Sequence, residues 1–166
     1  FLASLANMPE LVQLTLNAFS FYREEDLTAL GGVLAMGCPA LDQLQIQAFF
    51  HHKLDMTPFF TALGDLTSLQ LLNLSNCKLR PYQLLSALPH LPHSLSILDW
   101  SGNDVTEDLL KQMILCGRLD NLANFHITET PNDISRGVGM LLRSSQQQIL
   151  TVSAQSVTSL FTIVVL

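Results

Sequence analysis

The chain has 166 residues, of which 48% are apolar and only 13% charged, with 14 acidic and 8 basic side chains and a net charge of −6. This length is typical of one domain with a sizeable core. The scattered acidic residues and the lack of a Lys/Arg cluster argue against nucleic acid and anionic membranes as main partners, because both need basic surfaces. Since no apolar run approaches the roughly 18 residues that span a bilayer, we expect no membrane segment.

A recurring group of apolar residues predicts six strands along the chain. Its first copy is Leu11, Leu14 and Leu16 in LVQLTLNAF, and later copies start at residues 41, 69, 95, 122 and 147. The starts lie 30, 28, 26, 27 and 25 residues apart, a spacing too regular for chance. We therefore expect a single domain over residues 1–166 with strands near 11–17, 41–47, 69–75, 95–101, 122–128 and 147–153.

The segments between these strands read as helices. Thr57 is expected to cap the second of them, ahead of a proline at its first helical position. Acidic residues suit the start of the first and fourth helices, because a helix N-terminus attracts negative charge. The predicted helices begin at or directly after Glu24, Thr57, Pro81, Thr106 and Pro131.

The two ends of the chain extend the same pattern. FLASLANMPEL overlays FFTALGDLTSL, so that Phe1 corresponds to Phe59 and the chain is expected to open inside a helix of an earlier repeat. We therefore expect a fragment of a longer protein. The C-terminal segment SVTSLFTIVVL has two open interpretations: a strand that covers the last repeat, or the start of another repeat.

The best-preserved copies are LQLLNLSNCKL at residues 69–79 and LSILDWSGNDV at residues 95–105. Both match the leucine-rich-repeat pattern LxxLxLxx(N/C)xL. Positions 1, 4, 6 and 11 of the pattern are predicted to point into the core, which makes Trp100 a buried residue. Position 9, Cys77 or Asn103, is predicted to fill the corner where the strand ends. Other copies depart at position 9, and we expect looser or differently shaped corners at Phe19, Phe49 and Thr130.

These motifs and their spacing resemble the ribonuclease-inhibitor-like class of leucine-rich repeat proteins over about residues 1–155. Similar repeats form the C-terminal sensor domains of NOD-like receptors. NLSNCKL followed by LDWSGNDV also looks like PRAME-type proteins, whose repeats serve as substrate receptors for cullin ubiquitin ligases, although no cullin- or elongin-binding box is visible. The resemblance implies an α/β solenoid (horseshoe) with a parallel concave sheet and helices on the convex side. It also implies protein–protein binding, usually in the cytosol.

Positions 3, 5 and 7 of each repeat are predicted to point onto the concave face of the sheet. This face is polar but nearly uncharged, which favours protein recognition through hydrogen bonds. The alternatives are that these are only solvated strand residues, or that a partner uses the convex helices or loops. The predicted partner-binding residues are Gln13, Thr15, Asn17, Gln43, Gln45, Gln47, Leu71, Asn73, Ser75, Ile97, Asp99, Ser101, Asn124, His126 and Thr128, and the last copy adds Ile149, Thr151 and Ser153.

No catalytic motif is visible, so we expect neither enzyme activity nor a cofactor. Asp99 and His126, predicted on adjacent strands, are the only pair worth testing for a cryptic enzyme. His90 and His93 lie three residues apart, but prolines interrupt that segment and no further zinc ligand lies nearby. Aromatic residues cluster after the first two strands, and either packing or an exposed hot-spot edge explains Phe19, Phe21, Phe49 and Phe50.

The leading function hypothesis is a protein-interaction module that binds a protein partner on the concave face. It would belong to a larger receptor, adaptor, ubiquitin-ligase substrate receptor or effector. The alternative is a structural spacer or oligomerisation scaffold, motivated by the exposed ends and the apolar LFTIVVL tail. Three cysteines that lie far apart favour a reducing compartment, so we expect a cytoplasmic location.

Overall fold

The computed structural model of the chain describes residues 1–117, 122–129, 149–154 and 160–164, with the side chains of residues 107, 114 and 128 onward left out. The described residues form one seven-stranded sheet in which the strands follow chain order. Strands β1 to β6 run parallel, and β7 pairs antiparallel with β6. The strands are β1 (Gln13–Phe21), β2 (Gln43–Phe50), β3 (Leu71–Asn73), β4 (Ile97–Asp99), β5 (Asn124–Glu129), β6 (Ile149–Ala154) and β7 (Leu160–Val164).

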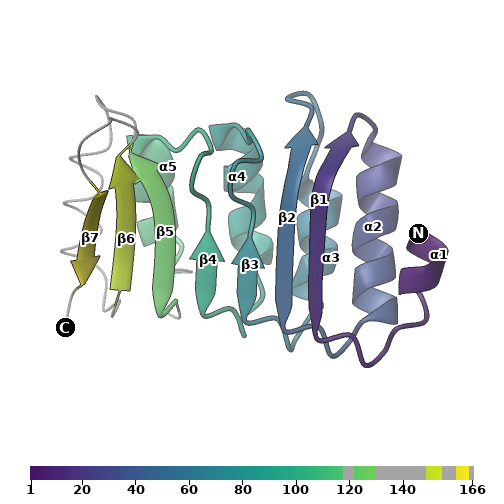
Figure 1. Cartoon of the computed structure of the whole chain (residues 1–166). Coiled ribbons are helices and arrows are strands. Elements are labelled where there is room, and N and C mark those ends of the chain that lie inside the picture. The colour runs from purple at the N-terminus through teal and green to yellow at the C-terminus, as the bar shows by residue number, and fades with distance from the viewer. Residues whose placement is uncertain (118–121, 130–148, 155–159, 165–166) are drawn as a thin grey trace.

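The described helices all lie on one side of this sheet and leave its other side, here called the open face, uncovered (Figure 1). The predicted α/β architecture, with parallel strands and helices on one side, is therefore confirmed, although the sheet is not curled over this length (Figure 1). The helical segments are α1 (Leu2–Leu5), α2 (Glu24–Gly37), α3 (Thr57–Gly64), α4 (Pro81–Ala87), the 3₁₀ turn η1 (Leu88–His90) and α5 (Glu107–Leu115).

The strand register follows the leucine spacing. The first four leucines of the central row, Leu14, Leu44, Leu72 and Leu98, stand side by side across β1 to β4, and Phe125 continues the row on β5. All of them except Leu14 are buried against the helices. Because each parallel strand places this position on the same side, the predicted core row is confirmed.

The helix starts show which capping predictions are correct. Thr106 accepts a hydrogen bond from the backbone N–H of Leu109 at 3.3 Å, as expected of a cap. Thr57 instead lies inside α3, and the carboxylate of Asp55 accepts its backbone N–H at 2.9 Å. The cap prediction for Thr57 is therefore wrong, because Thr57 is the first residue of the helix and Met56 occupies the cap position. Hydrogen bonds from the side chain and then the backbone N–H of Thr57 lower the pKa of Asp55 below its ordinary value.

A glycine in the middle of α2 has a packing role. A Cβ atom added to Gly31 would lie 3.0 Å from the Cβ of Ala62 and 3.3 Å from the Cα of Phe59. Glycine at this position therefore lets α2 and α3 approach closely. This packing offsets the low helix propensity of glycine.

The C-terminal strand distinguishes the two interpretations of SVTSLFTIVVL. Val164 pairs with Ile149 and Leu160 pairs with Ser153, so β7 runs antiparallel along β6. A new repeat would have started with a parallel strand, and the interpretation as a strand beside the last repeat is confirmed. The helix predicted from Pro131 and the corner at Thr130 lie outside the described residues. Within the described chain, no helix has both the length and the apolar character needed to cross a membrane.

Candidate functional site on the open face

The parallel register gathers the predicted binding residues into rows across the open face. One row contains Gln13, Gln43, Leu71, Ile97, Asn124 and Ile149, and a second contains Thr15, Gln45, Asn73, Asp99, His126 and Thr151. The third predicted row is interrupted in the middle: Asn17 pairs with Gln47 on β1 and β2, and Thr128 pairs with Ser153 on β5 and β6. Strands β3 and β4 end before they reach Ser75 and Ser101.

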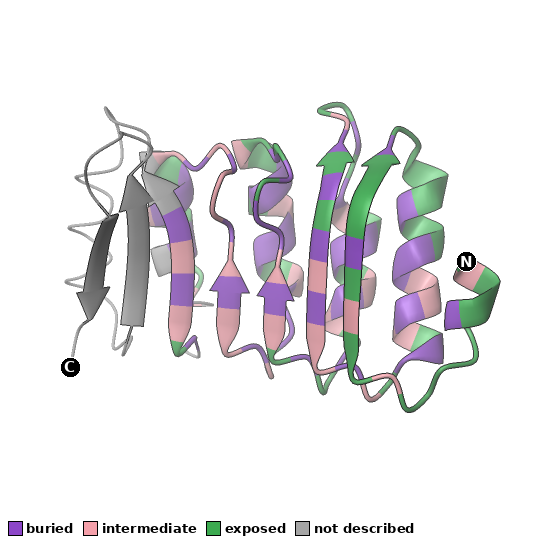
Figure 2. Ribbon diagram, viewed as in Figure 1, coloured by how far each residue is buried: buried purple, intermediate pink, exposed green. Residues whose placement is uncertain are grey.

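Exposure changes along these rows (Figure 2). On β1, the side chains of Gln13, Thr15 and Asn17 are exposed, whereas the predicted residues of β3 to β5 are half-buried. Ser75 departs from the prediction, since only 7% of it is exposed and it offers almost no surface to a partner. The side chains of Thr128, Ile149, Thr151 and Ser153 lie outside the described residues.

The polar side chains of the second row differ in how they are used. The Oδ1 atoms of Asn73 and Asp99 accept the backbone N–H groups of Ser75 and Ser101 at 2.8 and 2.9 Å. These two side chains are therefore engaged in local turns, a task that short Asx side chains perform readily. The polar side chains of β1 and β2 on this face make no side-chain hydrogen bond within the described chain. This unengaged group is Gln13, Thr15, Asn17, Gln43, Gln45 and Gln47.

Two buried corner residues stop the strands in the middle of the sheet. The Nδ2 atom of Asn103 donates to the carbonyl oxygens of Leu74 and Trp100 at 2.7 and 3.1 Å, and its Oδ1 accepts the N–H of Leu79 at 3.0 Å. Cys77 makes the equivalent contact one unit earlier, donating its thiol to the carbonyl of Ile46 at 3.0 Å. The predicted corner role of both residues is confirmed.

The environment of Cys77 also determines its chemistry. Burial raises the pKa of the Cys77 thiol from 9.0 to about 11, with a hydrogen bond opposing this shift and the charge of Asp99 adding to it. Since the thiolate is the reactive form, this cysteine is structural near neutral pH.

The aromatic cluster divides into a packed part and an exposed part. Phe21 and Phe50 are buried and stack with ring centroids 5.2 Å apart. Phe49 points to the open face because burial alternates along β2, and 37% of it remains exposed. Tyr22, 64% exposed, lies beside it, with ring centroids 5.9 Å apart. Phe19, also 37% exposed, pairs with Ala48 after a register shift in β1, and its ring contacts Phe1 and Phe21 instead. The packing interpretation is therefore confirmed for Phe21 and Phe50, and the exposed hot-spot edge stays a prediction for Phe49.

Sequence reasoning did not single out two residues in the turn after β3, Asn76 and Lys78. Both have a left-handed backbone, with φ of 58° and 55°. Asn76 aligns with Gly102 at position 8, and a Cβ on Gly102 would clash with the Asn76 side chain. An Asn and a Gly at one pattern position are a signal for a left-handed turn. No comparable sequence signal distinguishes Lys78.

The remaining candidates form no chemical site within the described residues. Asp99 and His126 are register neighbours, but no hydrogen bond joins their side chains there. Among the described residues, no three His, Cys, Asp or Glu side chains are placed to hold a metal ion. Trp100 is fully buried and packs edge-on against Phe125, with ring centroids 6.1 Å apart, as predicted for a core residue.

Comparison with protein-family models gives no match for this sequence. Comparison with curated proteins gives no match either.

Proposed function

We propose that the chain is a protein-interaction module that binds a protein partner on the open face of its sheet. The observation that carries this proposal is the set of unengaged amide and hydroxyl side chains over β1 and β2. They stand in register, one residue opposite the next, on a face that no described helix covers. Such side chains offer donors and acceptors to a partner without the desolvation cost of charges.

The kind of partner follows from the composition of this face. Leu71 and Ile97 lie between the amides of Gln43 and Asn124 in the same row, so apolar and hydrogen-bonding groups adjoin on this face. A protein surface supplies both kinds of group, and interfaces of this mixed composition are usual for non-obligate complexes. The proposed role is an interaction part of a larger receptor, adaptor, ubiquitin-ligase substrate receptor or effector in the cytoplasm, without chemistry of its own.

We further propose that the units are leucine-rich repeats stacked as a solenoid. Their starts recur every 25 to 30 residues, and the strands pair in chain order. The corners at Cys77 and Asn103 each bind the position-6 carbonyl of the preceding unit. This contact ties each unit to its neighbour, which is the nearest-neighbour stabilisation expected of a repeat stack.

A photo-cross-linking experiment tests the binding proposal. Benzoylphenylalanine replaces either Gln45 on the open face or Met36, which is 89% exposed on the helix layer. In lysate from the source cells, position 45 should give a discrete cross-linked protein that excess unlabelled chain competes away and that Gln43→Arg abolishes. Cross-linking to the same protein from position 36, or insensitivity to Gln43→Arg, would contradict use of the open face.

A second candidate function, an oligomerisation scaffold, is favoured by the edge strand β1. Its nine residues are mostly exposed, and Val12 just before it is 54% exposed. Unpaired strand edges are templates for pairing with another chain. Light scattering on the isolated chain should show a concentration-dependent dimer that Val12→Lys disrupts, whereas a monomer at all concentrations would eliminate this candidate.

A further inference from the structure

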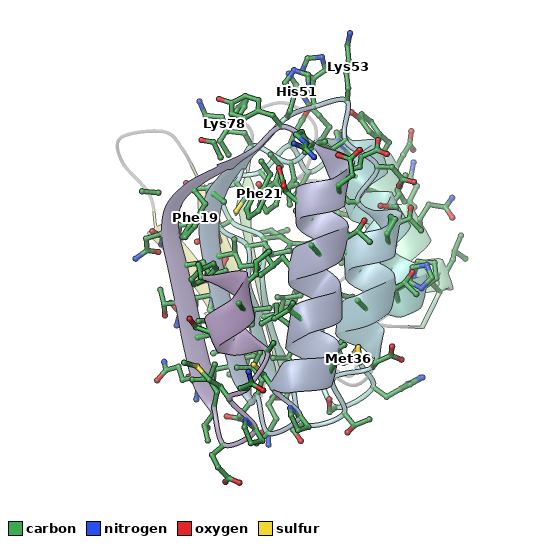
Figure 3. All side chains as sticks on the ribbon, turned by 90° about the vertical axis from the view of Figure 1, so that its right-hand side faces the viewer. Phe19, Phe21, Met36, His51, Lys53 and Lys78 are labelled. Atoms are coloured by element: carbon green, nitrogen blue, oxygen red, sulfur yellow. The ribbon has the colours of Figure 1, made fainter. Side chains whose placement is uncertain are left out.

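Two hollows flank Phe49 at the C-terminal ends of the first strands. One has a volume of about 410 Å³ and lies between the end of β1 and the turn after β3. The other, of about 420 Å³, lies between the end of β2 and the turns after β3 and β4. Phe49 and Lys78 line both hollows. We call the two hollows together the rim site. Figure 3 shows Lys78 at the same end of the molecule as His51 and Lys53.

Backbone strain is concentrated in the first hollow. Ala18, Asn76 and Lys78 have φ values of 61°, 58° and 55°, and they are the non-glycine residues with positive φ in the described chain. All three line the hollow of about 410 Å³. A left-handed conformation costs a residue such as alanine or lysine free energy, and residues held in it are enriched at binding sites.

The rim site also has a charge that differs from that of the whole chain. Lys78 is exposed and forms no ion pair within the described residues. Arg80 pairs with Asp104 at 3.3 Å, but both side chains are about half exposed, so this pair is weak. The two hollows are thus lined by two basic side chains and one acidic side chain, in a protein that has 14 acidic and 8 basic residues.

We propose that the rim site binds an acidic peptide segment that carries an apolar side chain beside a carboxylate. The apolar side chain packs against Phe49, which lines both hollows, and the carboxylate meets Lys78, with Arg80 in reach of a second acidic residue. Aromatic residues and arginine are enriched in protein interfaces, and the rim site contains Phe49 and Arg80 of these kinds. This inference rests on the proposed function only in taking the ligand to be a polypeptide.

Charge complementarity favours a peptide over a nucleic acid. A nucleic acid presents a long row of phosphates, which the net charge of −6 over the whole chain would repel. A short peptide places one or two carboxylates on the local positive charge and leaves the rest of the surface uncontacted. The apolar wall at Phe49 adds a contact that a phosphate backbone would not use.

Selection from a random peptide library displayed on phage tests this inference on the whole chain. The enriched sequences should place Asp or Glu within two or three residues of Phe, Trp or Leu. One such peptide, labelled with fluorescein, is then titrated by fluorescence anisotropy. Binding should weaken by about tenfold or more in Lys78→Gly and in Phe49→Gln. Added salt should weaken it as well, because the contact with Lys78 is exposed.

The variants are chosen so that unfolding cannot explain a loss of binding. Glycine tolerates positive φ, so Lys78→Gly removes the charge and relieves the strain, and its thermal melt should not fall. Met36→Gln removes an exposed apolar side chain far from the rim, near the other end of α2 (Figure 3), and should bind the peptide unchanged. A single-stranded oligonucleotide should not displace the peptide.

Each of the following outcomes would overturn the inference: no enriched motif, a motif without acidic residues, unchanged binding in Lys78→Gly, or displacement by the oligonucleotide. If this inference alone fails, the partner cross-link from position 45 persists. If the proposed function fails, position 45 gives no such cross-link. The cross-link at position 45 therefore distinguishes the two failures.

Discussion

The first two strand–helix units share their leucine spacing with the next two but end their strands differently. Strands β1 and β2 have nine and eight residues, whereas β3 and β4 have three each. In the short strands, the corner residues Cys77 and Asn103 hold the carbonyls of the preceding unit. In the long strands, position 9 is occupied by Phe19 or Phe49, which has no group to bind a carbonyl, and ladder pairing continues to Phe21 and Phe50.

This difference also separates structural from available side chains. In the short-strand units, Asn73 and Asp99 support the turn, and Ser75 is buried. In the long-strand units, Thr15 and Gln45 occupy the same row without a side-chain hydrogen bond in the described chain. Forming a corner thus uses the polar groups that a partner would otherwise contact. The unengaged polar side chains of the open face are concentrated where the corner is absent.

The largest expected effect comes from removing the amide corner. Asn103→Ala deletes three hydrogen bonds and leaves the N–H of Leu79 without its acceptor. We expect the free energy of unfolding to fall by about 3 kcal/mol, measured by urea denaturation. Asn17→Ala, the same change on the exposed face of β1, should cost less than about 0.5 kcal/mol. Equal losses in the two variants would refute the corner explanation.

The thiol corner should make stability depend on pH. The pKa of Cys77 is raised from 9.0 to about 11 by burial, so the unfolded chain loses this proton at lower pH than the folded chain. The free energy of unfolding should therefore be intact below pH 9 and fall by roughly 2–3 kcal/mol between pH 9 and 11. In Cys77→Ala this part of the decline should be missing. A decline of the same size in both proteins would assign it to other groups.

Removing the side chains of Asn73 and Asp99, which support the turns, should have a smaller effect on stability. Asn73→Ala and Asp99→Ala each remove one hydrogen bond to a turn N–H, at 2.8 and 2.9 Å. We expect each to lower the free energy of unfolding by about 1 kcal/mol. Gln45→Ala, in the same row of the long-strand region, should leave it unchanged in the same denaturant titration. If Gln45→Ala destabilises as much as Asp99→Ala, the two regions do not differ as described.

The smallest expected effect is a gain in stability. Lys78 has a φ of 55°, so Lys78→Gly should raise the free energy of unfolding by about 0.5 kcal/mol as the relieved strain exceeds the added chain entropy. Lys53→Gly provides the control, because Lys53 is not among the residues with positive φ in the described chain. Thermal denaturation of both variants measures the difference, and a gain in both or in neither would argue against strain at Lys78.

Some parts of the site were accessible to sequence reasoning because they depend on pattern position alone. The row through Thr15, Gln45, Asn73 and Asp99 follows from leucines that recur in parallel strands, and Asn103 could be recognised as a corner by its place at position 9. The exposure of Ser75 could not be predicted, since its burial depends on how closely the following turn packs. Phe49 could be named as an alternative hot-spot residue, but the rim site was missed because Lys78 comes from a different unit and meets Phe49 only in the fold.

The sequence by itself determined the order of the six parallel strands and, before the register shift after Asn17 and outside β7, the side of the sheet on which their residues lie. Regular apolar spacing suffices for this, because parallel strands at a constant period have one pairing that buries all the leucines. Only the tertiary structure decided where each strand stops, which open-face amides are unengaged and where the hollows form. Those properties depend on contacts between residues more than 20 positions apart, such as Asn103 with Leu74, and a local pattern does not encode whether such partners come within reach.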